Sequence, residues 1–172
     1  VRVVISGRRT ARETALLVLF AVDVGQTSDY RTSLDRFLSV FKADREILTE
    51  LLGHSDYDPA PSQLIERAIK TLQPDGSHWQ FVERMVKGVE AHSKAIDELI
   101  ERFSLNWKVS RMSRVDRNVL RLAAYELAFE SDVPSRATLN EAIEIAKRFG
   151  TEESGKFVNG ILDKIAQEFG RV

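Results

Sequence analysis

Cysteine is absent from this sequence of 172 residues, and proline is rare, with four in the whole chain. Without cysteine there can be no disulfide framework, no thiolate nucleophile and no cysteine-ligated metal site. Long apolar runs are missing too, because the opening "VRVVIS" is too short for a signal-peptide core and no other stretch reaches spanning length. We therefore expect a cytoplasmic protein with no membrane association.

An excess of charge of either sign is also missing, since 25 basic and 26 acidic residues leave a formal net charge of −1. A chain this close to neutral is not drawn as a whole to a polyanion. Any nucleic-acid-binding surface must therefore be a local patch. The hydrophobic share of 43% is typical of a globular chain that is long enough to bury a core as a single domain.

The scarcity of proline and glycine, with apolar residues spaced by three and four, predicts an all-α fold. The segment 53–63 holds turn-forming residues and two prolines, so we expect a loop or hinge there. The expected helices cover approximately residues 9–25, 32–52, 64–72, 78–103, 113–129, 138–150 and 151–169. In the first of these, the expected core stripe consists of Ala11, Ala15, Val18, Leu19 and Val22.

Capping patterns mark the starts of the last helices. Ser113 with Asp116, and Thr138 with Glu141, have the spacing of an N-cap and its acidic partner, and Thr151 can cap the final helix. Gly150 is expected to end the preceding helix, whose last turn carries basic residues. Four residues of the final helix are expected to face the core: Phe157, Ile161, Ile165 and Phe169.

No pattern in the sequence assembles a catalytic or metal site. "GTEESGKF" at 150–157 matches G-x-x-x-x-G-K, but Phe157 replaces the required hydroxyl, and a helix rather than a strand precedes it. His54, His78 and His92 lack the spacing that would place ligands on one helix face. Paired carboxylates are explained better as a cap and a solvated face, because no nucleophile is near them. We expect neither an enzyme nor a cofactor.

Two arginine clusters remain unexplained by the helices themselves. Arg8, Arg9 and Arg12 stand at a helix N-terminus, where the dipole disfavours cations, and their guanidinium groups with the unpaired amides would bind an anion such as phosphate. A solvated basic end compensated by Glu13 is the alternative. The second cluster has spacings of three, three and four and consists of Arg111, Arg114, Arg117 and Arg121. Salt bridges could account for some of these arginines.

Three longer stretches are recognisable as a set: "RRTARETALLVLF", "VDRNVLRLAAYEL" and "DVPSRATLNEAIEIAKRFGTEESGKFVNGILDKIA". Together they closely resemble the NusB family of bacterial transcription antitermination factors. The resemblance implies a NusB-like fold of two packed small helical bundles, within a single domain 1–172 that has subdomains at about 8–76 and 77–170. It also implies no catalysis and no cofactor.

The resemblance further implies partners. NusB-like proteins bind the boxA element of ribosomal RNA operon transcripts together with NusE, a ribosomal small-subunit protein, and help RNA polymerase read through terminators. They can also self-associate, so a homodimer is a further expected state.

The resemblance assigns roles to individual residues. RNA binding is expected at Arg8, Arg9, Arg12, Phe20, Lys156 and Phe157, and the second arginine cluster adds Arg117 and Arg121. Asp116 stands at an acidic position near the RNA and NusE surface. Glu126 interrupts an apolar run, so it makes either a partner contact, which we favour, or a hydrogen bond between helices.

Two other interpretations stay open. One is the NusB-like domain of a ribosomal RNA cytosine methyltransferase, although such enzymes need a nucleophilic cysteine and an α/β cofactor domain that this chain lacks. The other is a purely protein-binding helical module whose arginines make only salt bridges. The stretch 53–78 is longer than the family requires and receives no role.

Overall fold

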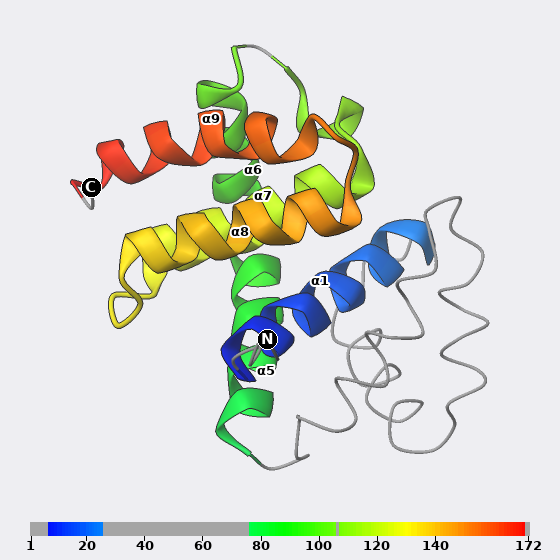
Figure 1. Ribbon diagram of the computed structural model, residues 1–172, viewed down its shortest axis with the longest axis vertical. Coiled ribbons are helices and arrows are strands. Elements are labelled where there is room, and N and C mark those ends of the chain that lie inside the picture. The colour runs from blue at the N-terminus through cyan, green and yellow to red at the C-terminus, as the bar shows by residue number, and fades with distance from the viewer. Residues whose placement is uncertain (1–6, 26–75, 106, 171–172) are drawn as a thin grey trace, which may run out of the picture. The chain divides into compact units, whose positions relative to one another are not determined.

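The computed structural model describes residues 7–25, 76–105 and 107–170, and every regular element in these ranges is helical (Figure 1). The α-helices are α1 (Gly7–Gly25), α5 (Ser77–Ala91), α6 (Ser93–Phe103), α7 (Arg114–Phe129), α8 (Ser135–Phe149) and α9 (Ser154–Glu168), with a short 3₁₀ turn, η1 (Val109–Arg111). The expected all-α class is confirmed. The expected helices at 32–52 and 64–72 and the loop at 53–63 lie outside the described residues.

The chain divides into two compact units, Val1–Lys87 and Gly88–Val172. The first unit contains α1 and α5 up to Lys87, and the second contains the end of α5 with α6 to α9.

In the first unit, α1 forms because its apolar residues recur on one face. The whole expected stripe is buried: Ala11, Ala15, Val18, Leu19 and Val22. The helix begins at Gly7, two residues earlier than expected, so the arginines that follow lie inside its first turns. A side chain at Gly7 would collide with the ring of His78, which shows that the starts of α1 and α5 approach each other closely.

In the second unit, α7 is the central element and packs against α6, α8 and α9 (Figure 1). Its start is the predicted one, because the Ser113 hydroxyl oxygen accepts a hydrogen bond of 3.0 Å from the Asp116 N–H. Its core residues, such as Leu120 and Leu127, are fully enclosed, and each contributes about 1.5–3 kcal/mol to folding. Gly88 on α5 leaves the room that the ring of Tyr125 occupies.

The prediction of one helix over 78–103 is wrong. The chain interrupts this helix at His92, whose φ of −113° and ψ of 15° lie outside the helical region, and α6 starts at the next residue. The His92 ring stacks on Phe129 of α7, with ring centroids 4.1 Å apart. This contact with a distant residue accompanies the break, and a pattern of apolar spacing does not report it.

Two predicted caps are also wrong. Pro134 is the N-cap of α8, and its carbonyl accepts hydrogen bonds from the N–H groups of Ala137 and Thr138, so Thr138 lies within the helix. The last helix begins at Ser154, after a turn in which the Ser154 N–H donates to the Thr151 carbonyl over 3.1 Å. The predicted stop of α8 at Gly150 is confirmed.

The expected core stripe of α9 is partly confirmed. Ile161 and Ile165 are buried, whereas Phe157 is half-buried and Phe169 is exposed. Phe169 follows the last helical residue as the C-cap. Because the helical period ends there, its side chain no longer continues the stripe.

Candidate nucleic-acid interface

Three guanidinium groups surround one phenyl ring in the first unit. The carbon at the centre of each guanidinium lies close to the Phe81 ring centroid, at 5.6 Å for Arg8, 5.3 Å for Arg12 and 5.4 Å for Arg84. Arg8 and Arg12 are four residues apart on α1, and Phe81 and Arg84 are three apart on α5, so each pair shares a helix face. We name these three arginines with Phe81 the arginine cluster. It contains Arg8 and Arg12 of the first run found in the sequence, and it adds Arg84 and Phe81.

The members of the arginine cluster differ in exposure. Arg8 and Arg84 are exposed, whereas Arg12 keeps 6% of its surface accessible and its Nη1 donates a long hydrogen bond of 3.5 Å to the Arg8 carbonyl. Arg9 is half-buried, and Arg9, Arg12 and Arg84 each interact with further groups of the chain. Arg8 and Arg84 are therefore the members that solvent reaches, whereas Arg12 is buried beside the same ring.

Sequence reasoning missed Arg84. Its signal is the spacing of three from Phe81, which places both on one face of α5, but only the fold brings them to α1. Phe20, the other aromatic residue expected in this interface, is half-buried on α1.

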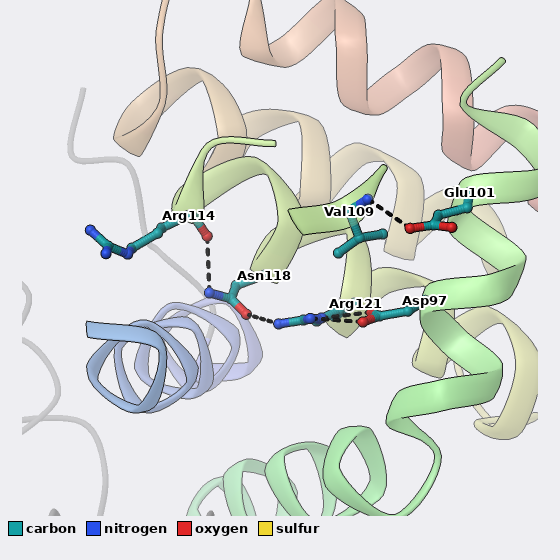
Figure 2. A network of polar contacts seen from close by, with 6 residues as sticks. All are labelled: Asp97, Glu101, Val109, Arg114, Asn118 and Arg121. Carbon is teal, nitrogen blue, oxygen red and sulfur yellow. Dashed lines mark hydrogen bonds and ion pairs between the residues drawn. The ribbon is translucent and has the colours of Figure 1, made fainter. Parts of the chain in front are cut away.

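The second arginine cluster, Arg111 to Arg121, lies in the second unit, and its last member makes hydrogen bonds within that unit. The Arg121 guanidinium donates two hydrogen bonds of 2.8 Å to the Asp97 carboxylate of α6 (Figure 2). Its Nη1 also donates to the Asn118 side-chain oxygen over 3.3 Å. The Arg121 side chain is 13% exposed. This geometry favours the salt-bridge interpretation for Arg121, which ties α7 to α6, over the predicted RNA contact.

The other members of this cluster are more accessible. Arg111 and Arg114 are exposed, and the Arg114 carbonyl accepts a hydrogen bond from the Asn118 amide (Figure 2). Arg117 is half-buried and interacts with other groups of the chain.

Glu126, the residue for which the sequence favoured a partner contact, lies in the core of the second unit. The Glu126 side chain is 1% exposed, and its Oε1 accepts a hydrogen bond of 2.9 Å from the Thr138 hydroxyl, which joins α7 to α8. A carboxylate inside a core is costly unless it is hydrogen-bonded, and Thr138 supplies a donor. The alternative that the sequence left open, a hydrogen bond between helices, is the observed one.

Asp116 is also largely buried, with 9% of its surface exposed. Its Oδ1 atom has no hydrogen-bond partner within the described part of the chain. Such atoms are rare, because a buried acceptor without a donor costs free energy. The assignment of Asp116 to a partner surface stays a prediction.

Lys156 and Phe157 lie at the start of α9, with different exposures. Lys156 is exposed and forms a 3.3 Å ion pair with Glu153, a type of surface pair that contributes little to stability. Phe157 is half-buried and contacts Trp107 edge to face, with ring centroids 6.5 Å apart. Trp107, which sequence reasoning did not single out, remains 56% exposed.

Within residues 7–25, 76–105 and 107–170, no group of three or more His, Asp or Glu side chains is arranged to hold a metal ion. No helix in that same part of the chain is both long and apolar enough to cross a membrane.

Comparison with known proteins places this chain in a family. The family model described as "NusB family" matches residues 9–167. The transcription antitermination protein NusB of Desulfitobacterium hafniense is 40% identical over 165 residues, which cover 95% of this chain and 90% of the relative.

Solved structures are similar over most of the chain. NusB of T. maritima is 39% identical and superposes with a TM-score of 0.63, covering 94% of this chain and 91% of that one. A structure of the antitermination factors NusB and NusE in complex with double-stranded RNA matches with a TM-score of 0.60, covering 94% and 97%. Its sequence identity of 24% supports the fold alone.

Proposed function

This chain belongs to the NusB family, and we propose that it is a transcription antitermination factor that binds boxA-type RNA of ribosomal RNA operons together with NusE. In this role it joins the RNA polymerase antitermination complex in the cytoplasm. It acts by binding alone, with neither catalysis nor a cofactor.

The observation that carries the proposal is the arginine cluster. Three cations lie within 5.3–5.6 Å of one ring centroid in a chain whose formal net charge is only −1. Guanidinium groups that share one ring concentrate positive charge locally, and a phosphate accepts charge-assisted hydrogen bonds from such groups. The Phe81 ring favours positions of these groups close to its centroid, which reduces the ordering that a ligand must impose.

We assign direct phosphate contacts to Arg8 and Arg84, the exposed members of the arginine cluster. Arg12 holds the cluster together from its buried position. Further RNA contacts from either unit remain part of the proposal at Arg9, Phe20, Arg117, Lys156 and Phe157. We also retain the proposal of one NusB-like domain with subdomains at about 8–76 and 77–170.

Two findings support NusE as the proposed partner: membership of the NusB family, and the similar fold in a structure of NusB and NusE with RNA. Asp116 is the proposed partner-facing residue, because it combines a largely buried carboxylate with an oxygen that lacks a donor among the described residues. A homodimer is a competing state that NusE would have to displace.

Fluorescence anisotropy with labelled RNA tests the proposal. The full chain is titrated into a boxA RNA and into a scrambled RNA of the same composition, each with and without NusE. We expect tighter binding to boxA than to the scrambled RNA, and a further gain with NusE for boxA. Equal affinities would contradict recognition of boxA, and absence of RNA binding would favour the protein-binding module.

A further inference from the structure

The segment that joins α6 to η1 exposes large apolar side chains. Trp107 remains 56% exposed and Leu105 83% exposed. The Phe157 ring meets Trp107 at 67° between ring planes, with centroids 6.5 Å apart, so Phe157 supports one side of the indole. Neighbouring exposed apolar side chains of this kind are a candidate binding surface.

The backbone on both sides of the indole is held by α6 and by Ser104, the C-cap of that helix. The Trp107 N–H donates to the Ser104 carbonyl over 3.2 Å, and the Ser104 hydroxyl donates to the Trp107 carbonyl over 2.7 Å. Beyond Trp107, Glu101 accepts a hydrogen bond of 2.8 Å from the Lys108 ammonium. It also accepts one of 3.0 Å from the Val109 N–H (Figure 2). Trp107 is therefore anchored before any ligand binds, which reduces the entropy lost on binding.

The charge of Glu101 supports this anchoring. The hydrogen bond from the Lys108 side chain, followed by that from the Val109 N–H, lowers the pKa of Glu101 below its ordinary value of 4.5. Glu101 is therefore ionised at neutral pH and keeps both donors.

The surroundings of the indole favour a nucleic-acid base over a protein surface. Lys108 follows Trp107 and Lys156 precedes Phe157, and both lysines are exposed and paired with glutamates. Lysine and glutamate are depleted in the cores of protein–protein interfaces. Sites for single-stranded nucleic acids instead combine aromatic rings with nearby cations, and Lys156 can exchange its weak surface pair with Glu153 for a phosphate.

We propose that Trp107 stacks against an unpaired base of bound RNA, with Phe157 positioning the indole and Lys108 and Lys156 beside the neighbouring phosphates. This inference rests on the proposed RNA-binding function. A stacked base of this kind contributes roughly 5- to 150-fold in affinity and tolerates different bases, because every base has a π-face.

The test compares Trp107→Phe with Trp107→Leu in the full chain, using boxA RNA and the same RNA carrying one abasic site. We expect Trp107→Phe to bind within a few-fold of wild type and Trp107→Leu to lose roughly 5-fold or more. The abasic RNA should bind wild type more weakly and be insensitive to Trp107→Leu. Stacking releases no counterions, so the dependence of affinity on salt should stay the same.

Intrinsic fluorescence gives a second readout, because the chain contains two tryptophans and the other, Trp79, is 4% exposed. RNA should quench the emission of wild type, and Trp107→Phe should abolish this quenching. Leu105→Ala is the matched control, since it removes a neighbouring exposed apolar side chain without removing a ring. Circular dichroism confirms that each variant is folded.

Several results would overturn the stacking proposal. They are wild-type affinity in Trp107→Leu, unquenched fluorescence in wild type, or an equal loss in Leu105→Ala. A loss of NusE binding without loss of RNA binding would make this a protein surface and would also overturn it. In each case RNA binding that still depends on Arg8 and Arg84 would leave the proposed function standing.

Discussion

Replacing both Arg8 and Arg84 by glutamine removes the exposed guanidinium groups of the arginine cluster and retains the buried Arg12. We expect RNA binding to weaken sharply and the fold to persist. Each arginine lies 5.4–5.6 Å from the Phe81 centroid, a contact that stabilises an exposed site by about 0.5–1 kcal/mol. Relief of repulsion, and of the unfavourable helix dipole at Arg8, offsets this loss, so the free energy of unfolding should change by less than about 1 kcal/mol.

The salt dependence of RNA affinity gives the magnitude. Each phosphate contact to a single strand contributes about 0.7 to the slope of log K against log salt concentration, so losing two contacts should flatten the slope by about 1.4. A salt titration followed by anisotropy measures this slope for wild type and for the Arg8→Gln, Arg84→Gln variant. Thermal melting checks that the variant is folded.

Arg102→Gln is the matched control for this experiment. Arg102 is also an arginine over a phenyl ring, 4.8 Å from the Phe103 centroid, but it pairs with Glu168 in the second unit. Its replacement should leave the salt slope unchanged. An unchanged slope in the folded Arg8→Gln, Arg84→Gln variant would refute the reasoning, because these arginines would then touch no phosphate.

Three further predictions concern the second unit. Gly88→Ala should cost about 1–3 kcal/mol of stability, since its Cβ would lie 2.0 Å from a ring atom of α7, whereas Gly160→Ala, with nothing within 4 Å, should be neutral or stabilising in thermal melts. Thr138→Val should lower the urea-unfolding free energy by about 1–3 kcal/mol because Glu126 loses a donor, and Thr138→Ser should restore most of it; equal stability of the two variants would contradict the hydrogen bond. Hydrogen bonds from the Lys108 ammonium and the Val109 N–H hold the pKa of Glu101 below 4.5. Its ionised form therefore stabilises the fold above that pH, and this contribution disappears as the pH falls through the lowered pKa. The stability difference between wild type and Glu101→Gln should therefore shrink in acid, and a constant difference in urea midpoint between pH 7 and pH 3 would count against this.

Local patterns predicted the parts of the fold that depend on neighbours in the sequence. The Ser113 cap and the end of α8 at Gly150 were correct, because a cap is satisfied within three or four residues. The Thr138 cap failed because the hydroxyl donates to Glu126, 12 residues earlier, and a capping pattern contains no information about that carboxylate.

The candidate site shows the same limit. Arg8 and Arg121 both belong to arginine runs, yet Arg121 is engaged by Asp97, 24 residues away, while Arg8 remains exposed over Phe81. The sequence identified the residue type that phosphate requires, but which arginines reach solvent depends on contacts between helices. Arg84 was not predicted for this reason, because its place beside Arg12 of α1 depends on the Phe81 ring that both arginines contact.

The central claim is that this chain binds boxA RNA and NusE as one cooperative assembly, and the affinity of NusE with and without RNA tests it most directly. Isothermal titration calorimetry of NusE into the free chain, and into the chain saturated with boxA RNA, gives the two dissociation constants. We predict that boxA RNA tightens NusE binding by the same factor by which NusE tightens RNA binding, since coupling between two ligands is reciprocal. A NusE dissociation constant unchanged by boxA RNA would contradict the account.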